Sequence, residues 1–136
     1  MNLKVCIMTP DQVFWDDPAE EIILPTNTGQ MGVLSRHASL ITALDIGVMS
    51  IRQNNTWTLV ALMNGFALVQ NDVVTILVNG AEGRSDIDHD EAKRAYDDAS
   101  SRASSTDGSQ DRKSSVEAAL DFKRARSRWL VASDAS

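Results

Sequence analysis

Short apolar runs separated by polar turns fill residues 1–85 of this 136-residue chain. In the first run Leu3, Val5 and Ile7 alternate with other residues, which is the period of a β-strand that buries one face. Turn pairs separate the runs, and their asparagines and glycines supply the positive φ angles that tight hairpins need. These pairs are Thr28-Gly29, Asn54-Asn55, Asn64-Gly65, Asn71-Asp72 and Asn79-Gly80. Because the last four pairs are only 7 to 10 residues apart, the pattern predicts an antiparallel sandwich or barrel.

The hydrophobic period changes near Ser85 to that of helices. One stripe consists of Ala92, Ala95, Tyr96, Ala99 and Ala103, and a second of Ala118, Phe122, Ala125, Trp129 and Ala132. These stripes predict helices at about residues 88–103 and 114–132, paired as an antiparallel hairpin. Because alanine methyl groups bury little apolar area, we expect a weakly packed hairpin that can rearrange.

Capping motifs mark the beginnings of both predicted helices. Asp88 is followed three residues later by Glu91, and Ser114 by Glu117, which is the spacing of a capping box. Residues 100–115 lie between the helices, contain seven serines and keep no apolar period. We expect them to form a flexible turn with Asp107-Gly108 at its tip.

The two patterns together predict an all-β N-terminal sandwich at residues 1–85 and a C-terminal antiparallel α-helical hairpin at residues 86–136, α+β overall. No apolar stretch approaches the ~20 residues that a transmembrane helix needs. The N-terminus enters the strand pattern at once, without the layout of a signal or transit peptide, so neither export nor import is expected.

Charge and cysteine content narrow the classes of partner. The net charge of −6 argues against a general nucleic-acid binder, because phosphate neutralisation needs a positive surface. The single cysteine, Cys6, cannot form an internal disulfide and suits a reducing compartment. We expect it to be a small core residue of the first strand.

His37 follows Arg36 in an isolated basic pair within the loop sequence SRHA. Only one other histidine, His89, exists, and Cys6 is far off in the pattern, so zinc-ligand spacing is missing. No local signature of an activated nucleophile accompanies it. Two interpretations stay open from the residues alone, an ordinary surface histidine and an interface histidine.

Two further patterns resemble catalytic or phosphate motifs. The sequence TNTGQMG follows a strand and opens no helix, which favours a hairpin turn over a phosphate-binding loop. The carboxylate groups are Asp16-Asp17, Glu20-Glu21 and Asp86, Asp88, Asp90 and Glu91. Spacing alone does not place two of them across a cleft, and capping and solvation explain the last group. We therefore predict no catalytic residue, no metal ligand and no cofactor.

A basic run, KRARSR, occupies residues 123–128 in the second predicted helix. At ~100° per residue, its arginines flank the apolar stripe on both sides. The four cations are Lys123, Arg124, Arg126 and Arg128. They form either a solvated face or an attachment site for an acidic protein surface, an anionic lipid surface or phosphate.

The whole chain resembles the epsilon subunits of F-type ATP synthases in their chloroplast and cyanobacterial form. The resemblance is carried by MTPDQVFWDDPAEEIILPT (8–26), TGQMGVLSRHASLITALDIGVMSIR (28–52), ALMNGFALV (61–69), VTILVNGAE (74–82), DID (86–88) and FKRARSR (122–128). These motifs follow one another in order over nearly the full length.

The resemblance implies a non-catalytic rotor subunit of the central stalk in a proton-translocating enzyme, where it couples the gamma subunit to the ring of c subunits. The family's c-ring contact matches Thr28, Gly29, Gln30 and Met31. The family's gamma contact matches Arg36, His37, Ala38 and Ser39. The resemblance thus favours the interface interpretation of His37.

The family's helical hairpin also inhibits ATP hydrolysis. It either folds against the sandwich or extends along gamma, where its second helix meets an acidic segment of the beta subunit. The matching cations are Lys123, Arg124, Arg126 and Arg128. Some bacterial members bind ATP at the hairpin, but Glu91 stands here where their motif has arginine, so no nucleotide is predicted.

The resemblance places the chain peripherally on the thylakoid membrane, on the stromal side in a chloroplast or the cytoplasmic side in a cyanobacterium. Nucleic acid is not an expected partner. The alternative hypothesis is a free-standing binding module whose basic second helix docks on anionic lipid or RNA. A hydrolase that uses the paired carboxylates is a third hypothesis and lacks a supporting constellation.

Overall fold

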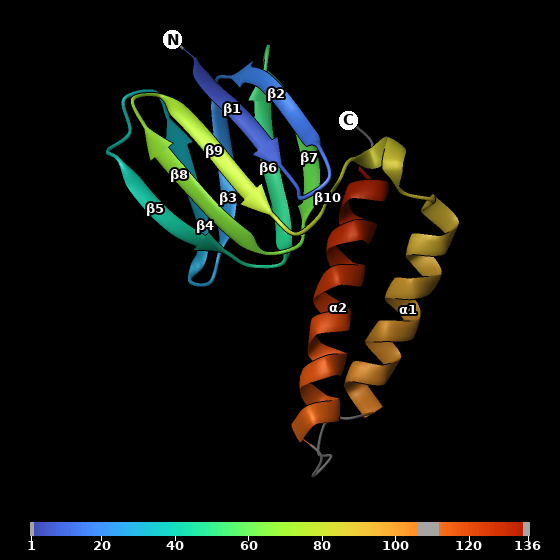
Figure 1. The fold of residues 1–136 in the computed structure, drawn as a ribbon. Coiled ribbons are helices and arrows are strands. Elements are labelled where there is room, and N and C mark those ends of the chain that lie inside the picture. The colour runs from blue at the N-terminus through green and yellow to red at the C-terminus, as the bar shows by residue number, and fades with distance from the viewer. Residues whose placement is uncertain (1, 106–111, 135–136) are drawn as a thin grey trace.

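The computed structural model describes residues 2–105 and 112–134, without the side chains of residues 105, 112 and 114. Within them the strands are β1 (Leu3–Met8), β2 (Val13–Ala19), β3 (Glu21–Thr26), β4 (Gly29–Leu34), β5 (Leu40–Leu44), β6 (Gly47–Gln53), β7 (Thr56–Leu62), β8 (Gly65–Gln70), β9 (Val73–Val78) and β10 (Ala81–Glu82). A short 3₁₀ helix, η1 (Arg84–Asp86), leads to the helices α1 (His89–Ser105) and α2 (Arg112–Ala132) (Figure 1).

The strands curl into one near-barrel sheet in the order β10-β7-β6-β3-β5-β8-β9-β1-β2, and β4 pairs with β3. The predicted sandwich followed by a helical hairpin is therefore confirmed. Among the strand pairs of the described residues, β1 and β9 alone run parallel. Turn spacing did not indicate this pairing, because it reports only on consecutive strands and β1 lies far from β9 along the chain.

The core lies between the two curved halves of the sheet. Leu3, Val5 and Ile7 are fully buried there, as their alternation predicts. The same alternation turns Cys6 to the opposite face of β1, where it is partly exposed. The expectation that Cys6 belongs to the core is thus wrong, because its strand has core on one face only.

Four of the five predicted turn pairs contain residues with positive φ, namely Gly29, Asn54, Asn55, Asn64, Gly65, Asn71 and Asp72. At Gly65 glycine is required, because a Cβ atom there would lie 2.0 Å from the Leu77 carbonyl oxygen. Asn79-Gly80 is the exception, because β10 continues to β7 instead of folding back on β9. The Asn79 side chain instead donates to Asn64 Oδ1 at 2.7 Å.

The helices pair along their predicted stripes. Ala92, Ala99, Ala118 and Ala125 are buried, and the rings of Tyr96 and Phe122 stack with centroids 5.7 Å apart. Asp88 caps α1, because its Oδ1 accepts the backbone N–H of Glu91 at 3.0 Å.

Both helices extend into the serine-rich segment 100–115, so the expectation of a flexible turn throughout it is wrong. At the C-terminal end of α1, Arg102 forms ion pairs with Asp98 and, across the hairpin, with Asp121. Because α2 already begins at Arg112, Ser114 lies inside the helix and is not its N-cap. Arginine and lysine are good helix formers, which favours this earlier start. The expected tip, Asp107-Gly108, lies outside the described residues.

The hairpin packs against one edge of the sandwich. Figure 1 shows α2 beside the sandwich and α1 on its outer side, with both helices extending past the strands. A small apolar cluster fills the contact and is separate from the sandwich core; its buried members are Ala61, Ile87, Ala92, Val131 and Ala132. Among the described residues, no helix has the length and apolar character needed to cross a bilayer.

Candidate docking surfaces

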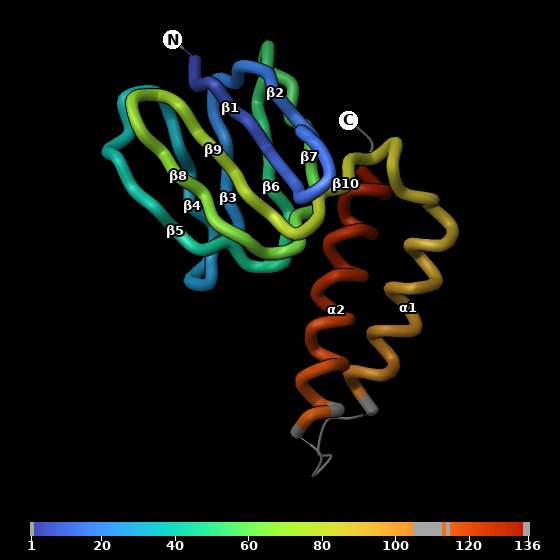
Figure 2. The backbone as a smooth tube through the Cα atoms, in the orientation of Figure 1, coloured from blue at the N-terminus to red at the C-terminus, as the bar shows by residue number. Residues whose placement is uncertain are grey.

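The loop between β4 and β5, which we call the His37 loop (residues 35–39), is held by the carboxylate of a residue far from it in the sequence. Asp72, in the turn between β8 and β9, accepts the backbone N–H of Arg36 at 2.6 Å and the hydroxyl of Ser35 at 3.4 Å. Figure 2 shows the loop and this turn at the same end of the sandwich. Arg36 has φ of +67°, an unfavourable angle for a residue with a Cβ atom.

His37 itself makes local contacts. Its backbone N–H donates to the Leu34 carbonyl at 3.2 Å, and its Nδ1 lies 2.7 Å from the Ala38 carbonyl oxygen, which requires a proton on Nδ1. The ring is half-buried, whereas Arg36, Ala38 and Ser39 are exposed. The structure therefore brings the four predicted gamma-contact residues onto one projecting loop.

An exposed apolar patch adjoins this loop on the outer face of β5, β8 and β9. Its members are Ile41 (74% exposed), Phe66 (59%), Leu77 (52%), Val73 (43%) and Leu68 (39%). Strand register aligns them, because Ile41 lies opposite Leu68 and Phe66 opposite Leu77. Sequence reasoning missed this patch. The signal was present, since β8 and β9 are apolar on both faces where a solvated sheet face carries polar residues.

The predicted c-ring contact forms the tip of the hairpin between β3 and β4. Gly29 has φ of +127°, and its carbonyl accepts the Thr26 hydroxyl at 2.7 Å. Thr28, Gly29 and Gln30 are exposed, whereas Met31 packs partly against the core. This tip and the His37 loop lie at opposite ends of β4 (Figure 1). The structure thus separates the two predicted contact sites.

Three of the four predicted inhibitory cations are engaged within the chain. Lys123 Nζ lies 3.0 Å from Asp45 Oδ2, and Arg128 contacts both carboxylate oxygens of Glu82, at 2.9 and 3.3 Å. Arg124 pairs within α2, 3.2 Å from Asp121. The first two pairs bind α2 to the sandwich, so these cations hold the hairpin in its folded position.

Arg126 alone of these four cations forms no ion pair with another described residue. It lines a groove of about 630 Å³ between α2 and the sandwich. Gly29, Gln30 and Lys123 line the same groove. The folded hairpin therefore places part of the predicted inhibitory set beside the predicted c-ring contact.

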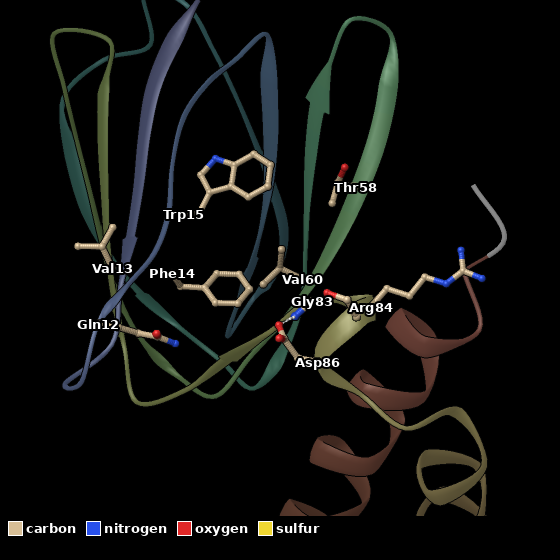
Figure 3. Close-up of a pocket in the computed structure, with 10 residues that line it drawn as sticks. Gln12, Val13, Phe14, Trp15, Thr58, Val60, Gly83, Arg84 and Asp86 are labelled. Carbon is tan, nitrogen blue, oxygen red and sulfur yellow. Dashed lines mark hydrogen bonds between the residues drawn. The ribbon is translucent and has the colours of Figure 1, made fainter.

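A further hollow opens where the near-barrel fails to close, between β2 and β7 (Figure 3). It measures about 830 Å³. Phe14 and Val60 point toward each other across it, and Arg84 points away from it (Figure 3). Asp86, its other charged lining residue, accepts the Gly83 N–H at 2.9 Å. Phe14 and Val60 thus give the hollow an apolar lining, and its two charged side chains do not converge on a common point.

Glu20, Glu21 and Asp88, three of the carboxylates that spacing singled out, have structural partners. Arg52 lies 2.7 Å from Glu20 and 3.2 Å from Glu21. The hydrogen bond from the Glu91 N–H lowers the pKa of the Asp88 carboxyl below its ordinary value. In the part of the chain that the structure describes, no three His, Cys, Asp or Glu side chains gather where a metal ion could be held.

Comparisons with known proteins agree with one another. Residues 2–84 match the family model described as ATP synthase, Delta/Epsilon chain, beta-sandwich domain. The chain is 59% identical over 131 residues to the chloroplastic ATP synthase epsilon chain of Chlorella vulgaris, covering 96% of each. The chain belongs to the ATP synthase epsilon family. It is 50% identical to the ATP synthase epsilon chain of Gloeothece citriformis, covering 95% of this chain and 94% of that one.

Solved structures bear on the fold of this epsilon-family chain. A chain of the Euglena gracilis mitochondrial ATP synthase matches 92% of it, with 78% of that chain covered, at a TM-score of 0.77 and 22% identity. Membership of the epsilon family makes the chain a non-catalytic subunit of the F-type ATP synthase central stalk. The match to the Chlorella vulgaris chain spans 131 residues, so it continues past the sandwich residues 2–84 into the helical segment.

Proposed function

We propose that the chain joins the gamma subunit to the c-ring through its sandwich and inhibits ATP hydrolysis through its hairpin. The observation that carries this proposal is the division of the molecule into two unequal parts. The sandwich has a continuous core of its own, and the hairpin is held to it by a separate small cluster and ion pairs. A fixed part suits permanent docking, and a weakly held part suits regulation.

The gamma subunit is the proposed occupant of the His37 loop and the adjoining apolar patch. Ile41 and Phe66 expose apolar surface to water, and covering that surface with a partner is favourable. The loop contributes an exposed cation, Arg36, at one end of this apolar area. An apolar surface with a polar margin is the usual composition of a stable subunit interface.

The c-ring is the proposed occupant of the β3–β4 tip. Because β4 has six residues and a strand rises ~3.4 Å per residue, the tip lies about 20 Å from the His37 loop. Two partners can therefore bind the same rigid sandwich without competing. Torque would pass between them through the hydrogen-bonded strands rather than through the hairpin.

The hairpin is the proposed brake. In the folded position Lys123 forms an ion pair with Asp45, and Arg128 forms one with Glu82. When the hairpin extends, these two cations are released and, together with Arg126, can bind an acidic segment of the beta subunit. Shifting such an equilibrium from 1:99 to 99:1 takes only ~5.5 kcal/mol, which is within reach of a few contacts.

The proposed location is the thylakoid membrane, with the chain held peripherally through the c-ring on the stromal or cytoplasmic side. Relatives from a green alga and from a cyanobacterium support it.

A binding experiment with the full chain tests the docking proposal. Immobilised chain is offered purified gamma subunit, c-rings, anionic vesicles and RNA separately. The proposal expects a stable complex with gamma. Recovery of only vesicles or RNA would replace it by the free-standing binding module.

A further inference from the structure

Asp72 links two segments that are 36 residues apart in the sequence. Its backbone is fixed to the sheet, because its carbonyl accepts the Lys4 N–H at 2.8 Å. Its carboxylate reaches across to the His37 loop and accepts the Arg36 N–H at 2.6 Å. A hydrogen bond to a charged acceptor at this length is among the stronger kinds in proteins.

The loop depends on this contact for its shape. Arg36 has φ of +67°, and such an angle persists in a residue with a Cβ atom only where its surroundings hold it. The neighbouring hydrogen bond, from His37 N–H to the Leu34 carbonyl, is local and does not tie the loop to another strand. Asp72 is therefore the anchor that ties the backbone of Arg36 to the sheet.

The contact leaves the Arg36 side chain available. Asp72 engages the backbone N–H of Arg36, and within the described residues the Arg36 guanidinium forms no ion pair. The backbone from which this exposed cation projects is thus held at the margin of the apolar patch. A partner that fits this arrangement presents an apolar area bordered by a carboxylate or another acceptor.

We propose that Asp72 is a positioning residue for gamma docking, which holds the His37 loop in the conformation that binds. This inference rests on the proposed function. Without the carboxylate, the loop spreads over several conformations, and the apparent affinity falls by the fraction that remains competent. Asp72 acts through the loop backbone.

Two substitutions at this position separate the hydrogen bond from the backbone angle. Asp72 has φ of +64°, which both glycine and asparagine tolerate. Asp72→Gly removes the acceptor, whereas Asp72→Asn keeps an oxygen that can accept the Arg36 N–H. Asn71→Gly is the matched control, because Asn71 has φ of +52° in the same turn.

The experiment measures binding of the full chain to purified gamma subunit and amide hydrogen exchange at Arg36. We expect Asp72→Gly to weaken binding about tenfold and to expose the Arg36 amide to exchange. Asp72→Asn and Asn71→Gly should stay within about twofold of the parent in binding. Unfolding midpoints are compared to confirm that each variant folds.

The outcomes distinguish this inference from the proposed function. If the parent chain does not bind gamma, the docking proposal fails, whereas the Arg36 exchange still reports whether Asp72 fixes the loop. If the parent binds and Asp72→Gly binds equally well, the positioning role is overturned. Equal losses of binding in Asp72→Gly and Asp72→Asn, with the Arg36 amide still protected in Asp72→Asn, also overturn it, because they would show that the charge acts on the partner directly.

Discussion

The two ion pairs between α2 and the sandwich predict how the hairpin responds to loss of charge. The perturbation is the double variant Asp45→Asn with Glu82→Gln, which keeps the shape of both side chains and removes both carboxylates. Lys123 and Arg128 then lose their partners in the folded position. The folded position should be weakened while the sandwich core, which contains neither pair, stays intact.

The magnitude follows from exposure and geometry. The side chains of Lys123 and Asp45 are 48% and 31% exposed, and an exposed ion pair contributes ~0.2–1 kcal/mol. Arg128 and Glu82 are 25% and 30% exposed, and their two-pronged contact is the stronger kind. Together we expect a loss of about 1–2 kcal/mol, which changes the ratio of folded to extended hairpin by about 5- to 30-fold.

Energy transfer between two dyes measures this ratio. One dye is placed at Asn55 in the sandwich and the other at Val116 in α2, through cysteines in a Cys6→Ser background; both positions are exposed. We expect lower transfer in the double variant and stronger inhibition of ATP hydrolysis by the assembled enzyme. High salt should reduce transfer in the parent chain as well, because it screens exposed ion pairs.

A matched control removes a carboxylate that does not bridge to the sandwich. Asp98 pairs with Arg102 inside α1, so Asp98→Asn changes the net charge without touching the contact. The reasoning is refuted if the double variant and Asp98→Asn give the same transfer as the parent. The hairpin would then be held by apolar packing alone.

Three further predictions concern the sandwich and the first cap. Phe66→Ser should weaken gamma binding more than tenfold in a pull-down titration, since burying such a ring contributes ~1.5–3 kcal/mol, while the unfolding midpoint stays unchanged. Gly65→Ala should reduce the free energy of unfolding in urea by more than about 2 kcal/mol, because its Cβ atom would lie 2.0 Å from the Leu77 carbonyl oxygen; an unchanged free energy would contradict this turn geometry. The pKa of the Asp88 carboxyl is lower in the folded chain than its ordinary value of 3.8, so its hydrogen bond to the Glu91 N–H persists above pH 3.8 and is lost as pH falls through the folded-state pKa. The Glu91 amide resonance should therefore have its titration midpoint below pH 3.8, and a midpoint at or above pH 3.8 would contradict this cap.

Local patterns predicted most of the elements because they depend on neighbouring residues. The alternation of Leu3, Val5 and Ile7 marked a buried strand face, and the spacing of Asp88 and Glu91 marked the start of a helix. Four turn pairs have the positive φ angles that their residues indicated. These features need no knowledge of the rest of the fold.

Contacts between distant segments were not predictable in this way. The parallel pairing of β1 with β9 and the bond from Asp72 to Arg36 join residues whose distance in sequence carries no signal. Cys6 was misplaced because it lies on the face of β1 opposite Leu3, Val5 and Ile7, and the strand pattern does not say whether distant segments cover that second face as well. The basic run predicted a cationic helix face but not its partners Asp45 and Glu82, which lie in the sandwich.

The central claim is that the hairpin must leave the sandwich to inhibit the enzyme. Its most direct test is a reversible lock between residues 45 and 123, whose charged atoms are 3.0 Å apart in the folded position. Asp45→Cys and Lys123→Cys in a Cys6→Ser chain are joined by a short cleavable thiol reagent, and ATP hydrolysis by the assembled enzyme is measured before and after cleavage. The account predicts fast hydrolysis with the lock closed and restored inhibition after cleavage. Inhibition that is equally strong with the lock closed would contradict it.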